Sequence, residues 1–231
     1  MQLRKRRVVR VSAKGNRIVA SNSAIQIRPT KDIILFTGTQ ESGKSYAAKE
    51  YIKKLKRVII WDYNWEYTKR EVTLICHSIK EVVWGIKLGH KKIAFQPQQL
   101  TETELESLCR TTIEHFRCST LVIEEIALFQ LTNTKYIAGN MPSLKAIFDT
   151  GRHERLRIGL FITSRRCIGI PPDITYNAMH MFIFQQDRPN DVKYIQEQIG
   201  TDLVEKLDYF PPFYFVHYQR TPKKTEIHKP L

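Results

Sequence analysis

Two glycines, a lysine and a serine stand at a spacing that suits phosphate binding. The stretch GTQESGKS occupies residues 38–45, so four residues separate Gly38 from Gly43-Lys44-Ser45. Glycines let backbone N–H groups turn towards phosphate oxygens, and a helix that starts after them adds its positive end. Lys44 would reach the β- and γ-phosphates, and Ser45 would hold Mg²⁺. The sequence therefore predicts a site for ATP and Mg²⁺, lined by Gly38, Thr39, Gln40, Glu41, Ser42, Gly43, Lys44, Ser45 and Tyr46.

Two adjacent carboxylates follow an apolar run further along the chain. Leu121-Val122-Ile123 leads directly into Glu124-Glu125, which matches the Walker B arrangement except that Asp is usual in the first position. Glu124 would orient the water shell of the metal, and Glu125 would accept a proton from the attacking water. Side chains alternate along a strand, so the two carboxylates should point apart and take separate roles. The alternative is a pair of surface glutamates at a strand end.

Arginines and a serine flank a third apolar run, residues 158–162. Arg152 and Arg155 precede it, and Ser164 and Arg165 follow it. Parallel sheets bind ligands at the carboxyl ends of their strands, so Ser164 and Arg165 should face the nucleotide and could sense the γ-phosphate. An arginine presented to the nucleotide of a neighbouring subunit would act as an arginine finger. For any single arginine, a surface charge or a salt bridge is an equally good interpretation.

Apolar runs that alternate with helical stretches should position these residues. The pattern predicts an α/β fold, a RecA-like P-loop NTPase core with a mostly parallel central sheet flanked by helices. Expected strands are 33–36, 57–61, 92–95, 120–123, 158–162 and 181–184, and expected helices are 45–55, 101–116, 143–153 and 192–199. Thr101 and Glu104 stand at capping-box spacing. The predicted divisions are a basic arm at 1–31, the ATPase core at 32–210, and a tail at 211–231 that ends in an edge strand.

The charge of the chain is concentrated near its start. Of a net charge of +14, nine positive charges fall in residues 1–31, which contain no Asp or Glu. Such an arm suits a polyanionic partner, nucleic acid above all. An equally good interpretation is a flexible or strand-forming leader, since Val8, Val9, Val11, Ile25 and Ile27 could pair in a sheet.

Cysteine and hydropathy patterns argue against several classes of protein. The four cysteines Cys76, Cys109, Cys118 and Cys167 form no Cys-x-x-Cys pair, and the seven histidines show no ligand spacing beside them. A structural zinc site or a disulfide framework is therefore not expected. No apolar run approaches the roughly 18 residues of a membrane span. We expect a soluble intracellular protein without membrane insertion.

Four segments together resemble the FtsK/HerA superfamily of DNA-pumping ATPases. Within it, they are most similar to the genome-packaging ATPases of tailless, membrane-containing double-stranded-DNA viruses. The segments are the phosphate loop, the stretch 60–67 with Asp62 and Glu66-Tyr67, the glutamate pair, and Gly151-Arg152-His153 with 159–164 and 170–174. The resemblance spans Ile33 to Gln198. One departure is Ser164-Arg165-Arg166-Cys167, where the family commonly has Ser/Thr-Gln-Arg-Pro.

This resemblance implies an ATP-driven double-stranded-DNA translocase that packages a viral genome. It implies a ring of five or six subunits with ATP at the subunit boundaries and Arg152 as the first choice of finger. DNA would be held through its phosphates, without sequence preference. A capsid-vertex protein would be a further partner, and the protein would act in the host cytoplasm or at the packaging vertex of the virion.

Three other functions stay open. A secretion or phage-assembly ATPase usually carries a membrane segment. A small-molecule or nucleoside kinase has little use for paired carboxylates that activate water. A non-hydrolysing, nucleotide-gated DNA-binding scaffold would fit a decayed Walker B motif, and the Glu in place of Asp at Glu124 keeps it possible. The base preference is also open, since Tyr46 could stack on adenine but the sequence does not require it.

Overall fold

A mixed sheet of eleven strands runs through the part of the chain that the computed structural model describes, residues 8–11, 18–20, 25–131, 133–200, 207 and 210–228. The strand order is β2-β1-β11-β10-β9-β3-β8-β7-β4-β6-β5. Neighbouring strands are parallel from β9 to β5 and antiparallel from β9 to β2. The strands are β1 (Val8–Val11), β2 (Ile18–Ala20), β3 (Ile33–Thr37), β4 (Val58–Trp61), β5 (Leu74–Cys76), β6 (Lys92–Phe95), β7 (Ser119–Ile123), β8 (Ile158–Ser164), β9 (His180–Ile183), β10 (Phe215–Gln219) and β11 (Lys224–His228).

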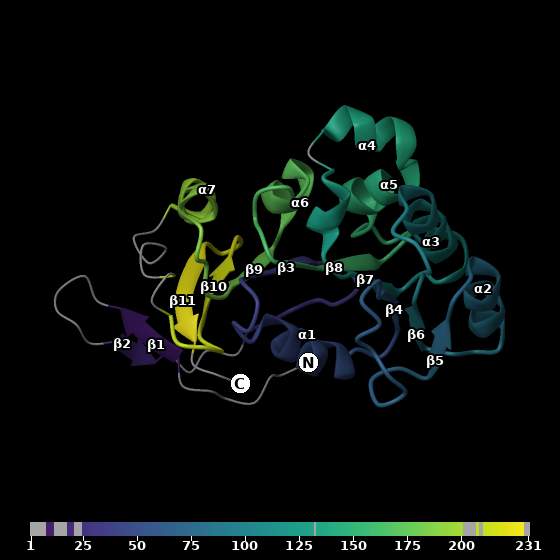
Figure 1. The fold of residues 1–231 in the computed structure, drawn as a ribbon, viewed down its shortest axis with the longest axis horizontal. Helices are drawn as coiled ribbons and strands as arrows, with labels where there is room; N and C mark the ends of the chain where they lie inside the picture. The colour runs from purple at the N-terminus through teal and green to yellow at the C-terminus, as the bar shows by residue number, and fades with distance from the viewer. Residues whose placement is uncertain are drawn as a thin grey trace.

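Helices cover both faces of this sheet (Figure 1). Helix α1 packs Ala48, Tyr51 and Ile52 on one face, and the other described helices bury apolar side chains on the opposite face. The helices are α1 (Lys44–Lys53), α2 (Ile79–Lys87), α3 (Glu102–His115), α4 (Thr134–Asn140), α5 (Pro142–Thr150), α6 (Pro172–Asn177) and α7 (Pro189–Ile199), with a 3₁₀ turn η1 (Ile126–Phe129). The sheet is thus packed between two apolar layers. This packing fixes the positions of the carboxyl ends of its parallel strands.

The predicted α/β fold, with a mostly parallel sheet flanked by helices, is confirmed. All six predicted strands are present, and α3 begins after Thr101, whose Oγ1 accepts a hydrogen bond from the Glu104 N–H at 3.3 Å. The sequence did not predict β5, α2, α4 or α6. The position of the C-terminal strand was also wrong, because β11 lies between β10 and β1 and not at an edge.

The N-terminal segment contributes two strands to the same sheet. Strand β1 pairs with β11, with Val8 opposite His228, and β2 pairs with β1. The interpretation of this segment as strand-forming is therefore confirmed for residues 8–11 and 18–20, while the rest of residues 1–24 lies outside the described residues. For Ile25 and Ile27 it was wrong, because these residues lie in no strand and pack against the apolar layer around α1. Contact with nucleic acid and the division at 1–31, 32–210 and 211–231 stay predictions.

Strand order places the segments that follow β3, β7 and β8, which contain the predicted site residues, at the same end of the parallel strands. Strand β8 lies between β3 and β7, and Thr37 at the end of β3 is level with Ser164 at the end of β8. On the other side of β8, Ile123 at the end of β7 is level with Ile162. Because the three strands are parallel, the segments that follow each of them leave the sheet side by side.

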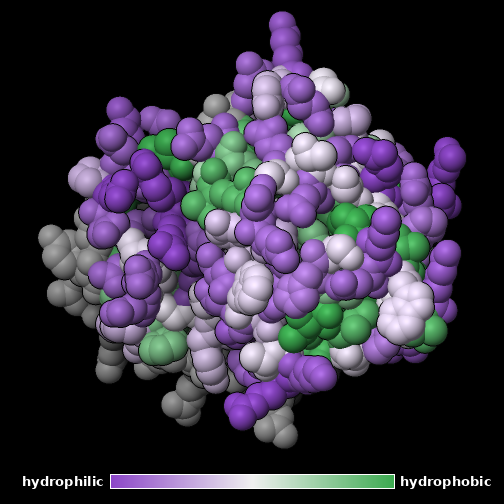
Figure 2. Space-filling view, turned by 45° about the vertical axis from the view of Figure 1, so that its right-hand side comes forward, coloured by the Kyte–Doolittle hydropathy of each residue, from purple (hydrophilic) through white to green (hydrophobic). Residues whose placement is uncertain are grey.

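Polar residues cover most of the face drawn in Figure 2, and apolar residues form separate areas among them. The longest described helix, α3, has 14 residues. None of the described helices is both long enough and apolar enough to cross a lipid bilayer.

Gly159 in β8 is expected to be essential for stability. A Cβ atom there would lie 1.9 Å from the Pro29 carbonyl oxygen, so Gly159→Ala must displace the backbone of the segment before β3. We expect it to lower the free energy of unfolding by about 1–3 kcal/mol, the usual cost of overpacking. Urea denaturation measures this change. Gly139→Ala in α4 is the control, because a Cβ there meets nothing within 4 Å; equal stability of the two variants would contradict the argument.

Candidate active site

The phosphate loop, residues 38–43, joins β3 to α1 and is held from several sides. The Gly38 N–H donates to the Ser164 carbonyl at 3.2 Å, and the Thr39 N–H donates to the Gln185 carbonyl at 2.9 Å. Within the loop, Ser42 Oγ donates to the Thr39 carbonyl at 2.8 Å. Helix α1 begins at Lys44, so its positive end lies at the loop, as the sequence predicts.

An aromatic residue from the far end of the chain packs on this loop. Gly43 has a φ of +93°, and a Cβ atom there would lie 2.5 Å from the ring of Phe213. The Phe213 N–H donates to the Ser42 carbonyl at 2.8 Å. Its ring meets that of Tyr46 edge to face, with 5.9 Å between centroids. Glycine at 43 is therefore needed both for the backbone conformation and for the approach of Phe213.

A cavity of about 430 Å³ opens beside the loop. Its lining comes from the loop, the start of α1, and side chains that follow β4, β7 and β8. The lining residues are Thr39, Gln40, Glu41, Gly43, Lys44, Ser45, Tyr46, Glu66, Glu125, Arg165 and Phe213. The structure thus brings most of the predicted nucleotide-binding residues to one cavity, with Gly38 and Ser42 supporting the loop behind it.

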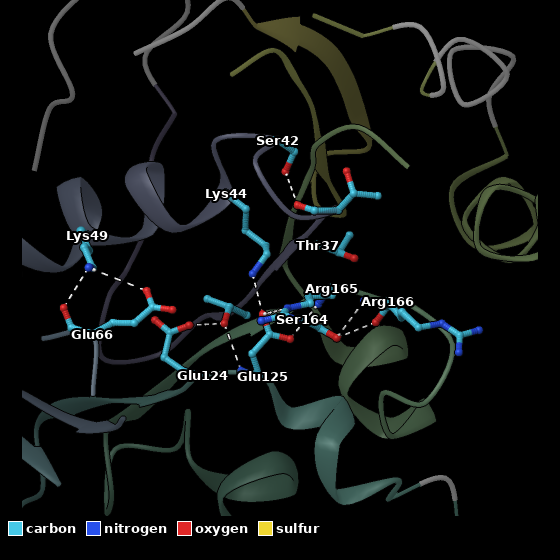
Figure 3. Close-up of polar contacts among 12 residues, drawn as sticks. Thr37, Ser42, Lys44, Lys49, Glu66, Glu124, Glu125, Ser164, Arg165 and Arg166 are labelled. Atoms are coloured by element: carbon cyan, nitrogen blue, oxygen red, sulfur yellow. Dashed lines mark hydrogen bonds and ion pairs between the residues drawn. The ribbon is translucent and has the colours of Figure 1, made fainter. Parts of the chain in front are cut away.

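Glu125 points from the end of β7 to the phosphate loop. Its Oε1 atom accepts a hydrogen bond from Lys44 Nζ at 2.8 Å, and both side chains are buried (Figure 3). The Arg165 N–H donates to Glu125 Oε2 at 3.0 Å, and Arg165 Nε lies 3.6 Å from Oε1. Glu125 has a φ of 53°, a left-handed conformation that is uncommon outside glycine. This turn of the backbone aims the carboxylate at the cavity.

Glu124 has a different set of partners. It accepts hydrogen bonds from the hydroxyl groups of Tyr67 and Thr163. Thr163 Oγ1 also accepts from the Glu125 N–H at 3.1 Å, so one threonine contacts both members of the pair. Burial raises the pKa of Glu124, while the two hydroxyl donors and the charge of Lys44 act to lower it. Glu124 does not line the cavity, and its predicted role at the metal stays a prediction.

A turn after β4 supplies the tyrosine that contacts Glu124. Asp62 is fully buried and accepts hydrogen bonds from the N–H groups of Glu66 and Tyr67 at 2.8 and 3.0 Å. Gln96 Nε2 donates to the same carboxylate at 2.8 Å. Burial raises the pKa of Asp62, although these three hydrogen-bond donors act to lower it. Asp62 thus shapes a turn that directs Tyr67 to Glu124 and Glu66 to the cavity.

Ser164 and Arg152 lie away from the cavity. Ser164 is fully buried, and its Oγ donates to the Arg166 carbonyl at 2.6 Å and accepts from the Arg166 N–H at 3.2 Å (Figure 3). Arg152 is exposed between α5 and β8, at the opposite end of β8 from Ser164, where it lines a small hollow with Arg28 and Lys31. The structure therefore brings Arg165, but neither Arg152 nor the Ser164 hydroxyl, to the nucleotide cavity of the same chain.

Sequence reasoning missed four residues of the site: Phe213, Glu66, Tyr67 and Thr163. For Glu66 and Tyr67 a signal existed, because the stretch from Asp62 to Tyr67 carries part of the family resemblance. Thr163 precedes the predicted pair Ser164 and Arg165, and its inward direction follows from strand alternation.

Comparison with known proteins gives structural likeness only. No protein-family model matches the sequence, and no curated protein sequence matches it. The genome-packaging NTPase B204 from Sulfolobus turreted icosahedral virus 2, solved with AMPPCP, is similar over 87% of this chain and 99% of its own, with a TM-score of 0.72 and 22% identity. VirB4 of Thermoanaerobacter pseudethanolicus is similar over 97% of this chain and 96% of its own, with a TM-score of 0.60 and 10% identity. The pCW3 conjugation coupling protein TcpA covers 95% of this chain and 64% of its own at a TM-score of 0.53 and 13% identity.

These likenesses confirm the predicted P-loop NTPase fold. They also confirm, at the level of the fold, the predicted resemblance to a viral genome-packaging ATPase.

Proposed function

We propose that this chain hydrolyses ATP to move double-stranded DNA, most specifically as the motor that packages a viral genome. One observation carries the enzymatic half of the proposal: Glu125 Oε1 lies 2.8 Å from Lys44 Nζ inside a cavity of about 430 Å³ that the phosphate loop lines. A buried carboxylate next to the phosphate-binding lysine is placed to accept the proton of a water that attacks the γ-phosphate.

The residues of the cavity would have different roles in hydrolysis. The loop N–H groups and Lys44 bind the phosphates of ATP, and Arg165 holds the Glu125 carboxylate through its N–H. Mg²⁺ fits the donor set, because the Ser45 hydroxyl and the Glu66 carboxylate supply oxygens at the cavity, the ligand type that this ion prefers. When bound there, Mg²⁺ would neutralise charge that develops on the phosphate oxygens. Glu124, directed by Tyr67 and Thr163, would orient its water shell from behind.

Charge and fold support the DNA half of the proposal. Nine positive charges without any acidic residue in residues 1–31, within a net charge of +14, suit the phosphate backbone of DNA. A DNA-packaging ATPase, B204 from Sulfolobus turreted icosahedral virus, has a similar fold over 89% of this chain. We propose a ring of five or six subunits in which Arg152 reaches the cavity of a neighbour, since it does not line its own. A capsid-vertex protein would anchor the ring at the virion, or the ring would act in the host cytoplasm.

The proposal is tested by steady-state ATP hydrolysis with and without long double-stranded DNA, at low and high salt. We expect DNA to stimulate hydrolysis strongly at low salt and weakly at high salt, because phosphate contacts release counterions. The hydrolysis measured with a Glu125→Gln preparation is subtracted as the contribution of any contaminating ATPase. Hydrolysis that is indifferent to DNA at every salt concentration would contradict translocation and leave a simple ATPase.

Phe213 is expected to bind the base of the nucleotide. Its ring and that of Tyr46 line the cavity next to Gly43, and stacking of a base on an aromatic side chain is worth about 1–3 kcal/mol. Phe213→Ala should therefore raise the KM for ATP roughly 5- to 150-fold with a smaller change in kcat. Phe213→Tyr keeps the ring and should leave KM within about twofold. An unchanged KM in Phe213→Ala would show that the base binds elsewhere.

A second candidate function is an ATPase of a conjugation or secretion system. The fold shared with TcpA, a conjugation coupling protein, favours it. In the same ATPase assay, stimulation by DNA alone is the result expected of a packaging motor, whereas hydrolysis that is indifferent to DNA would favour a secretion ATPase.

A further inference from the structure

Three buried side chains of the types that bind metals gather on the β10–β11 hairpin, which β9 separates from β3, the strand before the phosphate loop (Figure 1). They are His217 on β10 and Glu226 and His228 on β11, with exposed fractions of 2%, 5% and 7%. One ligand atom from each lies within 4.8 Å of the other two. Within the described residues, no other group of three or more His, Cys, Asp or Glu side chains is gathered in this way.

Strand pairing explains why the three side chains share one face. His217 is directly opposite Glu226, and Phe215 is directly opposite His228. Opposed residues of antiparallel strands project from the same face, and so do residues two apart on one strand. The Phe215 ring also stacks on His228, with 4.9 Å between centroids and 2° between planes, so this imidazole is held in a fixed orientation.

Two contacts favour one tautomer of His217, an ion-pair contact between Asp32 and His180 and a hydrogen bond between His180 and His217. The Asp32 carboxylate lies 3.6 Å from His180 Nε2, which favours a proton on that nitrogen. His180 Nδ1 then accepts from His217 Nε2 at 3.1 Å. Nδ1 of His217 is left with its lone pair, the state in which imidazole binds metal. Ligating histidines commonly donate their other N–H to such a partner.

His228 supplies the second observation. Its Nε2 atom is buried and has no hydrogen-bond partner among the described residues. A buried polar atom without a partner costs free energy unless something binds it.

We propose that His217, Glu226 and His228 bind a zinc ion. Two imidazoles and one carboxylate are a ligand set that Zn²⁺ takes in proteins, with water in the fourth position. Lys224 Nζ contacts Glu226 Oε1 at 2.8 Å, and the Lys224 side chain is 36% exposed, so an ion that binds Glu226 would compete with this contact. The expectation of no zinc site rested on spacing along the sequence, whereas strand pairing brings these ligands together. The ion would tie β10 to β11, the strands that join the parallel half of the sheet to β1.

The test is metal binding by the full chain, measured without nucleotide. After chelator treatment, zinc is titrated in competition with a chromophoric chelator, in excess Mg²⁺. We expect one equivalent of zinc per chain and a rise in Tm. His228→Gln and Glu226→Gln should each abolish binding, and His180→Gln should weaken it about 10- to 100-fold, as loss of a partner of a ligand does.

Two controls exclude adventitious binding. Cys118 and His115 are exposed, so Cys118→Ser and His115→Gln should leave affinity and stoichiometry unchanged. Cobalt added to the unmodified protein gives a measurement that does not depend on the folding of any variant. Intense visible absorption bands of four-coordinate Co²⁺ support the site. Absence of such bands, no zinc equivalent, or equal affinity in His228→Gln would overturn it.

Discussion

Replacing Glu125 with Gln is expected to lower the kcat for ATP hydrolysis by about 10²–10⁴-fold, the usual contribution of a positioned general base. Glutamine keeps the shape of the side chain but cannot accept the proton of water. Nucleotide affinity should be equal or higher, because Lys44 no longer shares its charge with a carboxylate 2.8 Å away. The rate of phosphate release under saturating ATP gives kcat, and equilibrium binding of a fluorescent ATP analogue gives the nucleotide affinity.

The matched control is Glu114→Gln, an exposed glutamate on α3 far from the cavity lining. It should change neither kcat nor affinity. If Glu125→Gln retained more than about a tenth of the activity, Glu125 would not be the base. Glu66, another carboxylate that lines the cavity, would then be the next candidate.

Arg152→Ala is expected to reduce ATP turnover by about 10³–10⁵-fold, the range of an arginine finger. Arg152 is exposed and lines no part of the nucleotide cavity of its own chain, so binding of ATP to an isolated subunit should not change. The loss would arise only where a neighbouring subunit presents the guanidinium to the phosphates. Turnover is measured in parallel with nucleotide affinity and with the oligomeric state by light scattering.

Mixing two inactive variants tests whether this arginine acts between subunits. Arg152→Ala chains keep Glu125, and Glu125→Gln chains keep Arg152, so a mixed ring contains some complete sites and regains activity. Arg117→Ala, which removes an exposed charge at the end of α3, controls for net charge and should remain active alone. No regain on mixing, in rings that are shown to form, would place the arginine finger elsewhere; Arg155 would be examined next.

The parallel half of the fold was predictable because its signals are local. Strands such as β7 and β8 are apolar runs buried on both faces, and the loop and helix after β3 carry their chemistry in consecutive residues. Helix α2 also had a signal, since Ser78 caps it by accepting from the Glu81 N–H, the spacing already used for Thr101 and Glu104. Helices α4 and α6, with 7 and 6 residues, are too short for a helical periodicity to emerge.

What the sequence could not show depends on pairing between distant residues. Phe213 reaches Gly43 only because β10 returns beside β9 and not at an outer edge. The left-handed backbone at Glu125 likewise follows from tertiary contacts, among them Lys44 and Arg165, and no local pattern announces it. The histidines of the β10–β11 hairpin were dismissed on spacing for the same reason.

The contact between Lys44 and Glu125 also has a consequence for timing. The ammonium that neutralises this carboxylate is the one that a γ-phosphate would bind, and a single ammonium cannot serve both fully. If the proposed function holds, arrival of ATP would draw Lys44 away and free the base, and departure of phosphate would let the pair form again. In this way the Lys44–Glu125 ion pair would keep Glu125 from activating water until ATP is bound to the same chain.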